Sequence, residues 1–529
     1  METQASYLYG AAIQGIQGFI FQTNSLKDIV GASELVECIC TTLFAQQLGY
    51  SGNTSQLIEA LRKDENAIVN AAGTIKYLFP SREACEKVVR NFPKAVIEFA
   101  PGITVSQAVV EMQDNFSDED FKKAVLTLEA RLRIQRNRPM RSTQPGWLGI
   151  ERSRQTGLPV IDRRNKKNEP LMLDAASFRK LYTMKEGERE GRKMSTQLLF
   201  NKAYKGCRTE QIPFQLKDLT DRNDWIAVIH ADGNGLGQVV QHIGANRGKL
   251  KKFSYQLDLA TTQAANGAFD EVRKIFPAAF CDKVPFRPIV LSGDDHTLIC
   301  RADLAIPYLV SFIKLFEEKT HSLLGDLLQG VFKDKKVNML TVCAGIAFIK
   351  SSFPFYYAYE LAESLCSFAK KDTKENYDFN AGNLPASCLA FHKVQDSFIV
   401  DYKDIILREL TPNKNYTFQF GPYYVYGGEG LLSDAPAKQK GRWSVEQLLA
   451  LSDKLEQKEW SAVRSGLRSW ITHVYMNADL AEQKKTRMKM IAADEEQKKL
   501  IETLCGQTSS PVYDLLSLVT IRTQETQRV

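Results

Sequence analysis

Short apolar runs of strand length alternate along the chain with longer stretches whose apolar residues recur every three to four positions. A continuous apolar run fits a strand buried on both faces, and the longer spacing fits an amphipathic helix. In the middle of the chain the pattern predicts a strand at 225–231, a helix at Phe253–Ile275, strands at Pro288–Leu291 and His296–Arg301, a helix at Ala305–Leu328, a strand at Asn338–Ile349 and a helix at Pro354–Lys371.

This order is β-α-β-β-α-β, the split βαβ or ferredoxin-like pattern, which puts the first strand at the centre of the sheet beside the hairpin. A weaker copy of the same order occupies the N-terminus. Its predicted elements are a strand at Tyr7–Ile13, a helical region at Phe19–Leu48, a hairpin at Ala67–Phe79, a helix at Ser81–Asn91 and a closing strand within Ala95–Glu111. The sequence therefore predicts an internal duplication.

The length of 529 residues is too great for one hydrophobic core. The predicted fold class is α+β, with two ferredoxin-like (palm) domains, an inter-palm insert and a C-terminal helical domain. The predicted boundaries are 1–120 for a degenerate N-terminal palm, 121–220 for the insert, 221–435 for the catalytic palm and 436–529 for the helical domain.

Acidic residues stand at the ends of neighbouring strands of the second palm. The central strand runs into Asp232, and the hairpin turn carries Asp294 and Asp295. Carboxylates are hard oxygen ligands for Mg²⁺ or Mn²⁺, and phosphoryl transfer needs metals between the attacking hydroxyl and the triphosphate. Either acidic group alone fits a plain turn better, but together they favour a two-metal site. We predict all three aspartates as metal ligands and catalytic residues. The first palm has Asn-Ala-Ala-Gly at the matching turn, without carboxylates.

Glycines follow Asp232 in the sequence Asp-Gly-Asn-Gly-Leu-Gly. The spacing differs from a dinucleotide-binding fingerprint, and no helix is expected to open at once after it. We interpret the stretch as a loop that lets backbone N–H groups approach phosphate.

Composition and charge change this picture little. Hydrophobic residues make up 44% of this chain and charged residues 25%, as in ordinary globular proteins. The net charge of +7 favours polyanionic partners only mildly. The 10 cysteines are scattered without a Cys-x-x-Cys pair, which argues against a disulfide framework or a zinc ribbon. No leader and no bilayer-length apolar stretch is evident, so we expect a cytoplasmic protein without a membrane partner.

Ordered motifs along most of the chain resemble those of the large polymerase-like subunit of type III CRISPR effector complexes, a family with two palms in one chain and a GGDD hairpin in the second. More distantly, the second palm resembles the GGDEF diguanylate cyclases. The matching stretches are Gly15–Gln22, Lys27–Leu35, Ala231–Gly237, Ser292–Asp295, Cys343–Ala347, Ala358–Lys370 and Ser387–His392.

The resemblance implies a metal-dependent nucleotidyltransferase that joins ATP into cyclic oligoadenylates, second messengers of prokaryotic antiviral defence. It implies ATP or another NTP as substrate, and a CRISPR RNA with other effector subunits as partners. A weak or inactive scaffold subunit of an RNA-guided complex and a GGDEF-like cyclase that uses GTP remain alternatives, and Lys370 also fits a lysine that complements a helix dipole. The implied nucleotide contacts are Gly233, Asn234, Gly235, Gly237, Ser292, Gly293, Lys370, Ser33 and Glu34.

The chain departs from the family at three points. Ser292 replaces the first glycine of GGDD, a small residue that the turn should tolerate. No His-Asp dipeptide is present, so an HD nuclease domain is not expected. The stretch Trp147–Pro159 has no cysteine where the family often has a zinc cluster, so no zinc is expected. A stand-alone synthase and a compact effector subunit both fit these departures.

Overall fold

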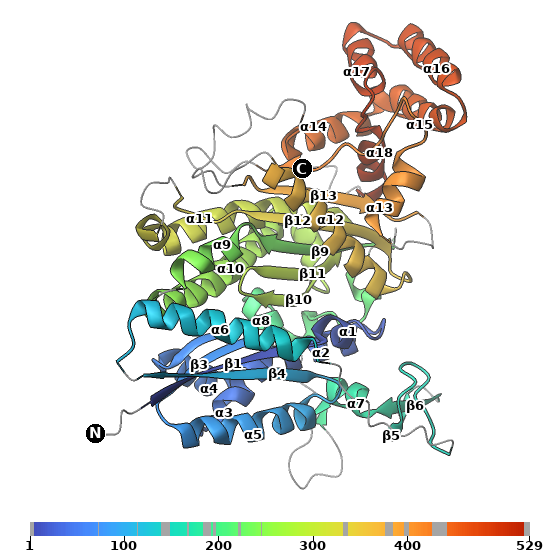
Figure 1. The fold of residues 1–529 in the computed structure, drawn as a ribbon. Helices are drawn as coiled ribbons and strands as arrows, with labels where there is room; N and C mark the ends of the chain where they lie inside the picture. Colours follow the sequence, from blue (N-terminus) through green and yellow to red (C-terminus); the bar gives the residue numbers. More distant parts are fainter. Residues whose placement is uncertain are drawn as a thin grey trace.

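Two α+β domains lie side by side in the computed structural model, and a helical domain extends from the second of them (Figure 1). The first domain and the helical domain form opposite ends of the molecule (Figure 1). The structure describes residues 5–71, 73–113, 115–138, 149–166, 169–183, 192–193, 197–220, 224–244, 246–331, 337–375, 385–395, 401–425 and 442–522.

The first domain is built on a four-stranded sheet of order β2-β3-β1-β4. The central strand β1 pairs antiparallel with both β3 and β4. This order is that of a ferredoxin-like fold, which confirms the predicted first palm. Its elements are β1 (Ala5–Gln14), α1 (Ile16–Ile20), α2 (Leu26–Cys38), η1 (Ile39–Leu43), α3 (Phe44–Gln47), α4 (Thr54–Lys63), β2 (Ala67–Ala71), β3 (Thr74–Phe79), α5 (Arg82–Phe99) and β4 (Thr104–Gln113).

Helix α6 (Asp118–Arg136) packs on β1 and β4 of the first palm. Its buried residues Phe121, Ala124, Leu128 and Leu132 recur every three to four positions, so one narrow stripe of a highly charged helix faces the sheet. The domain boundary that we predicted at residue 120 falls inside this helix, which by its contacts is part of the palm.

The second domain contains a six-stranded sheet of order β10-β11-β9-β12-β13-β14. Strand β9 pairs antiparallel with β11 and β12, as the predicted palm order requires. Helices α10 and α11 pack on each other, and α12 packs on β9, β12 and β13. The elements are β9 (Trp225–Gly233), α10 (Arg247–Ile275), β10 (Phe286–Ser292), β11 (Asp295–Arg301), α11 (Ala305–Val331), β12 (Val342–Lys350), α12 (Phe355–Glu375), β13 (Cys388–Lys393) and β14 (Tyr423–Tyr424).

A short helix, α9 (Leu236–Ile243), follows β9 directly and corrects our expectation that no helix opens there. Gly235 precedes it with φ 72°, a left-handed conformation that suits glycine and turns the chain into the helix. Val239 and Ile243 are its buried residues, four positions apart. The glycines mask the start of this helix in the sequence because glycine disfavours helices.

The segment between the palms contains β5 (Val160–Lys166), β6 (Glu169–Asp174), α7 (Ala175–Leu181), β7 (Tyr182–Thr183), β8 (Arg192–Lys193) and α8 (Leu198–Ala203). Helix α7 packs on α2 of the first palm at Gly31, where a Cβ atom would lie 1.8 Å from the Lys180 carbonyl oxygen. Lys180 is itself buried, and its Nζ donates to the Phe19 carbonyl at 2.7 Å. The insert therefore braces the end of α1.

The chain after the second palm is helical, as predicted. Trp470 is fully buried at the centre of this domain. Its helices are α14 (Val445–Glu456), α15 (Ser461–Met476), α16 (Ala478–Ile491), α17 (Glu495–Cys505) and α18 (Val512–Ile521), whereas α13 (Tyr402–Ile405) precedes β14 of the second palm in the chain. Within the described residues, no helix combines the length and the apolar character needed to cross a bilayer.

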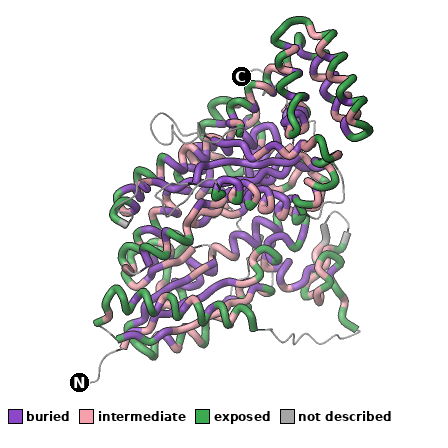
Figure 2. Tube along the Cα trace, turned by 45° about the horizontal axis from the view of Figure 1, so that its top comes forward, coloured by how far each residue is buried: buried purple, intermediate pink, exposed green. Residues whose placement is uncertain are grey.

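Buried residues are concentrated in the sheets of the two palms and in the helices that pack on them (Figure 2). The strands β9 and β12 are buried almost without interruption, which explains their continuous apolar sequences.

Gly345 on β12 allows α12 to lie directly on the sheet. A Cβ atom at this position would come within 2.0 Å of the Ala362 carbonyl oxygen and 2.6 Å of Cys366 N, both backbone atoms of α12. We expect Gly345→Ala to destabilise the protein by about 3 kcal/mol, because the helix must move away. Urea unfolding measures this change.

The control for this variant is Gly330→Ala on α11, where nothing lies within 4 Å of the added atom. This change should leave stability equal or raise it by up to about 1 kcal/mol through helix propensity. Equal unfolding midpoints for Gly345→Ala and wild type would contradict the close contact.

Candidate active site

The acidic turn is a two-residue hairpin connection between β10 and β11. Ser292 pairs with Asp295 across it, and Gly293 has φ 64°, the left-handed conformation that favours glycine. Ser292 lies in the strand, where any residue fits, so the departure from GGDD carries no backbone strain. Helix α10 holds the turn: Thr261 Oγ1 donates to the Gly293 carbonyl at 2.6 Å.

Asp232 at the end of β9 and Asp294 in the turn are in direct contact through a side-chain hydrogen bond. Gly233 permits this approach, because a Cβ atom there would lie 3.0 Å from Asp294 Cβ. Lys370 from α12 completes the group: its Nζ donates to Asp232 Oδ2, and to the Gly233 carbonyl at 2.8 Å.

The two carboxyl groups differ in protonation. Burial, and then the hydrogen bond and charge of Asp232, raise the pKa of Asp294. Burial acts in the same direction on Asp232, but the neighbouring Lys370 ammonium outweighs it and lowers the pKa of Asp232. In the absence of a cation, the Asp294 carboxyl therefore donates a hydrogen bond to the Asp232 carboxylate.

Asp295 contacts other side chains than this pair does. Its Oδ1 accepts a hydrogen bond from Thr297 Oγ1 at 3.3 Å and lies 3.5 Å from His230 Nδ1. Burial, and then the charge of Asp232, raise the pKa of Asp295 to about 7. In the described part of the chain, no three His, Cys, Asp or Glu side chains gather as a ready-made metal site. The structure thus joins two of the predicted aspartates directly and sets the third beside them.

The residues around Asp232 suit a divalent cation. The Lys370 ammonium lies between a carboxylate oxygen and a carbonyl oxygen, which are the ligand types that Mg²⁺ and Mn²⁺ prefer. A cation there would also remove the need for the shared proton of Asp294. The predicted Mg²⁺ or Mn²⁺ fits these residues and stays a prediction.

A cavity of ≈ 470 Å³ lies between the two palms, next to the acidic turn. Three predicted site residues line it: Ser33 from the first palm, and Ser292 and Asp295 from the second. Its other lining residues are Ile13, Gly15, Ile16, Gln17, Gly18, Ile20, Phe21, Val36, Glu37, Gly73, Leu199, Val290, Leu291 and Tyr359. Most of the walls are apolar, with a few polar groups, as in sites for small organic ligands.

Contacts across the cavity join the palms at its rim. Ser33 Oγ donates to the Ile289 carbonyl of β10. On the other side, Gln17 Nε2 donates to Tyr359 Oη at 3.3 Å and to Glu363 Oε1 at 3.2 Å. The Phe21 ring stacks on Tyr359 with 4.1 Å between ring centroids. Residues distant in sequence therefore form one composite site, as the duplication predicted.

Glu34 does not line the cavity, which corrects our prediction for this residue. Its carboxylate is buried, and Oε1 accepts a hydrogen bond from Leu199 N at 2.9 Å. Burial raises the pKa of Glu34 to about 7, although the Arg287 charge acts against this. Neighbouring positions on a helix point in different directions, so Glu34 supports the palm contact while Ser33 faces the cavity.

The predicted glycine loop forms the start of α9. Asn234 is buried, and its Nδ2 donates to Thr341 Oγ1 at 3.1 Å, which makes it a support for the loop. Gly237 is exposed in the first turn of α9. Gly233, Gly235 and Gly237 are absent from the cavity wall, as are Gly293, Lys370, Asp232 and Asp294.

Sequence reasoning missed Tyr359 and Glu37 as residues of the cavity, and Glu363 at its rim. Tyr359, Glu363 and Lys370 are four and seven positions apart on α12 and therefore share one face of the helix. This spacing could have identified them once Lys370 was singled out. The same argument applies to Glu37, which follows the predicted residue Ser33 by four positions on α2 and therefore shares its face of the helix.

The raised pKa of Asp295 predicts a pH-dependent stability difference. An unfolded aspartate has a pKa near 4, whereas the pKa of Asp295 in the folded protein is about 7. Between these two pH values the folded protein binds more protons at Asp295 than the unfolded chain does, so stability falls as the pH rises. Asp295→Asn should stabilise the metal-free protein at pH 8 by roughly 1–2 kcal/mol, a figure that is reduced because the side chain is partly exposed. At pH 4 the variant and the wild type should be about equally stable. Thermal melts with a chelator test this; an equal effect at both pH values would contradict it.

Comparison with known proteins identifies the second palm. Residues 225–377 match the family model of the Cas10/Cmr2 second palm domain. The resemblance predicted from the sequence is thereby confirmed for the segment that contains Asp232, Asp294, Asp295 and Lys370. No curated protein matches the chain.

The cysteine-free stretch Trp147–Pro159, for which we predicted no zinc, is described only in part. Trp147 and Leu148, at its start, lie outside the described residues.

Similar solved structures come from CRISPR assemblies. A chain of the Csm1–Csm4 cassette in complex with pppApApA is 12% identical, with a TM-score of 0.51, over 98% of this chain and 69% of that one. The cassette in complex with cA3 gives 13% identity, a TM-score of 0.48, and coverage of 99% and 70%. The Csm1–Csm4 subcomplex of the type III-A interference complex gives 13% identity, a TM-score of 0.48, and coverage of 98% and 70%. The first of these supports the two-palm fold.

Proposed function

We propose that this protein joins ATP molecules into cyclic oligoadenylates in prokaryotic antiviral defence. The observation that carries the proposal is the composite site itself. A palm of the Cas10/Cmr2 family presents Asp232 and Asp294 in contact, and Asp295 lines a cavity whose opposite wall is the first palm. The fold match to a cassette crystallised with pppApApA, a linear adenylate, supports the same substrate class.

The reaction joins the 3′-hydroxyl of one nucleotide to the α-phosphate of another and releases pyrophosphate. It needs no side-chain nucleophile, so the task of the protein is to position two nucleotides and stabilise charge. The cavity between the palms suits the base and ribose of one nucleotide, because its walls are mainly apolar with polar groups at Ser33, Gln17 and Glu37. The second nucleotide is expected over the β9–α9 loop, where the N-terminus of α9 and the Gly233–Gly237 backbone favour phosphate.

Asp232, Asp294 and Asp295 would hold Mg²⁺ or Mn²⁺ in this reaction. The bound cation supplies Lewis-acid stabilisation of the phosphoryl oxygens and lowers the pKa of the attacking hydroxyl. With a cation bound beside Asp232, Asp294 would be held as a carboxylate ligand. Lys370, which contacts Asp232 in the metal-free protein, would then pair with the triphosphate. Tyr359 and His230 shape the cavity side of Asp295, and the neutral His230 ring adds no charge there, because burial lowers its pKa.

The proposed protein partners follow from the same comparisons. The match to a chain of a Csm1–Csm4 cassette supports association with other effector subunits. A guide RNA is proposed as a partner from the sequence resemblance alone.

The proposal is tested by product analysis. The purified protein is incubated with each of the four NTPs and Mg²⁺ or Mn²⁺, and products are separated by chromatography and identified by mass spectrometry. We expect cyclic adenylates from ATP. Products from GTP alone would indicate a GGDEF-like cyclase, and nucleotide binding without any product would indicate a scaffold subunit.

A further inference from the structure

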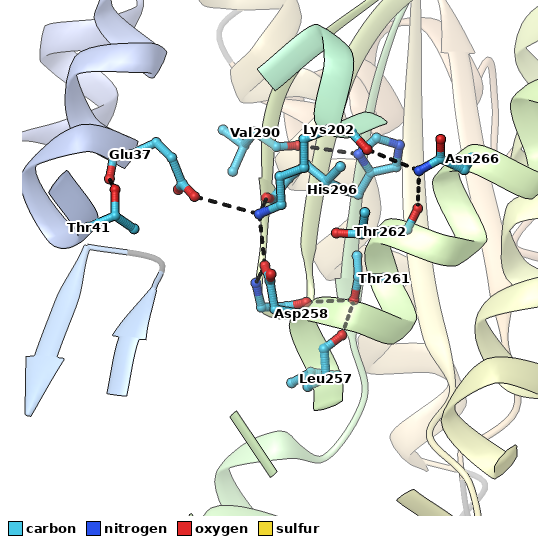
Figure 3. A network of polar contacts seen from close by, with 12 residues as sticks. Glu37, Thr41, Lys202, Leu257, Asp258, Thr261, Thr262, Asn266, Val290 and His296 are labelled. Atoms are coloured by element: carbon cyan, nitrogen blue, oxygen red, sulfur yellow. Dashed lines mark hydrogen bonds and ion pairs between the residues drawn. The ribbon is translucent and has the colours of Figure 1, made fainter. Parts of the chain in front are cut away.

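Lys202 is a mostly buried lysine on α8, in the insert between the palms, with 19% of its side chain exposed. Its Nζ donates to Asp258 Oδ1 at 2.9 Å and to the Leu291 carbonyl at 2.8 Å, and lies 3.6 Å from Glu37 Oε1 (Figure 3). Burying a lysine costs desolvation free energy even when three oxygen atoms surround its ammonium group, so Lys202 is expected to have a role beyond packing.

The three partners belong to different parts of the molecule. Glu37 lies on α2 of the first palm and lines the cavity. Asp258 lies on α10 of the second palm, and Leu291 directly precedes the Ser292–Asp295 turn on β10. One ammonium group therefore contacts a wall of the cavity, the helix beneath the acidic turn and the strand that leads into the turn.

The partners of Lys202 also hold the turn itself. Asp258 Oδ1 accepts a hydrogen bond from Gly293 N at 3.4 Å, while Thr261 on the same helix donates to the Gly293 carbonyl. The backbone of Lys202 is also held by α10, because Asn266 Nδ2 donates to the Lys202 carbonyl at 3.0 Å (Figure 3). The lysine and α10 thus form one support under the residues that place Asp294 and Asp295.

Charge makes this support sensitive to the state of the cavity. Burial would lower the pKa of Lys202, but the charges of Glu37 and Asp258 outweigh it and raise the pKa, so the ammonium persists at neutral pH. Without it, two carboxylates would face each other in a poorly solvated region. A ligand that contacts Glu37 from the cavity changes how strongly this carboxylate attracts the Lys202 ammonium. The contacts of the ammonium with Asp258 and with the Leu291 carbonyl then become stronger or weaker in response.

We propose that Lys202 is a positioning residue that holds the Ser292–Asp295 turn in place and couples it, through Glu37, to the presence of a nucleotide in the cavity. This inference rests on the proposed function, since it takes the cavity as a nucleotide site. It assigns to the insert a supporting role in the reaction, through Lys202.

Hydrogen–deuterium exchange tests the coupling without any turnover. AMP-PNP with Mg²⁺ should slow exchange in peptides that cover 286–301 in the wild type and in Lys205→Met, which removes an exposed lysine three residues away. In Lys202→Met this protection should be lost, although calorimetry still detects the nucleotide. Equal protection in Lys202→Met and the wild type, or no protection in the wild type, would overturn the proposal.

Kinetics separate positioning from binding. Lys202→Met should lower kcat by about a hundredfold and leave KM close to the wild-type value, because a misplaced turn impairs the reaction more than the encounter. Lys202→Arg should recover part of the rate. Glu37→Gln in the Lys202→Met background removes the uncompensated charge, so this double variant keeps the test valid if Lys202→Met folds poorly. A rise in KM alone would make Lys202 a binding residue and contradict the proposal.

Failure of the inference and of the proposed function give different results. If the wild type makes cyclic adenylates while Lys202→Met behaves as Lys205→Met does, the coupling is wrong and the function stands. If AMP-PNP protects the turn only when Lys202 is present but no NTP yields a product, the coupling stands and the proposed function is wrong.

Discussion

The Asp294→Ala/Asp295→Ala double variant is expected to join nucleotides about a thousandfold more slowly than the wild type, a loss of about 4 kcal/mol of transition-state stabilisation. The reason is the removal of the oxygen ligands that hold the cation between the two nucleotides. Initial rates with ATP and Mg²⁺ measure the loss.

The fold should survive this change. Burial raises the pKa of both carboxyl groups, so each is held in an environment that disfavours its charged form. Thermal melts of the metal-free double variant should therefore match the wild type or lie above it. Asp270→Ala/Asp326→Ala removes the same charge from exposed positions on α10 and α11 and should keep full activity. A double variant that retains more than about a tenth of the wild-type rate would contradict the assigned role of the two aspartates.

Lys370→Met is expected to lower the rate by about a hundredfold, because Asp232 loses its partner and the triphosphate loses a cation. Only 17% of the Lys370 side chain is exposed, and its ammonium is the group that lowers the pKa of Asp232. The acid limb of the pH–rate profile should consequently move to higher pH in the variant. Rates measured across pH at subsaturating Mg²⁺, where protons and Lys370 compete with the cation for Asp232, show both effects.

Lys371 provides the matched control, since it is the next residue on α12 and 79% of its side chain is exposed. Lys371→Met removes the same charge and should retain the wild-type rate and pH profile. If the two variants behave alike, Lys370 does no more than complement the helix dipole, as the alternative interpretation of the sequence allowed.

The core of the second palm was predictable because its strands are buried on both faces. Runs such as Ile226–Ile229 are apolar throughout and are followed closely by acidic residues, so both the strand and the end that carries the chemistry can be recognised in the sequence. The order of elements then fixed which strands are neighbours. The pairing of β9 with β11 confirms that inference.

Other features depend on contacts that no local pattern records. Helix α9 is hidden by glycines, and α6 carries only a narrow apolar stripe among charged residues. Glu34 and Ser33 are adjacent in the sequence, but Glu34 contacts Leu199 and Ser33 contacts β10. Which of the two residues faces the cavity depends on how α2 packs against β10, and no local sequence pattern records this packing. Lys202 is one of many lysines in the chain, and its partners are more than fifty residues away or in another domain.

The central claim is that the two palms of one chain form a single site for nucleotidyl transfer. Its most direct test is the rate of adenylate joining per chain, measured with ATP and Mg²⁺ over a wide range of protein concentration. The composite site between the palms predicts a rate per chain that is independent of concentration. A rate per chain that rises with concentration would show that two chains must meet, as in a homodimeric GGDEF cyclase, and would contradict the claim.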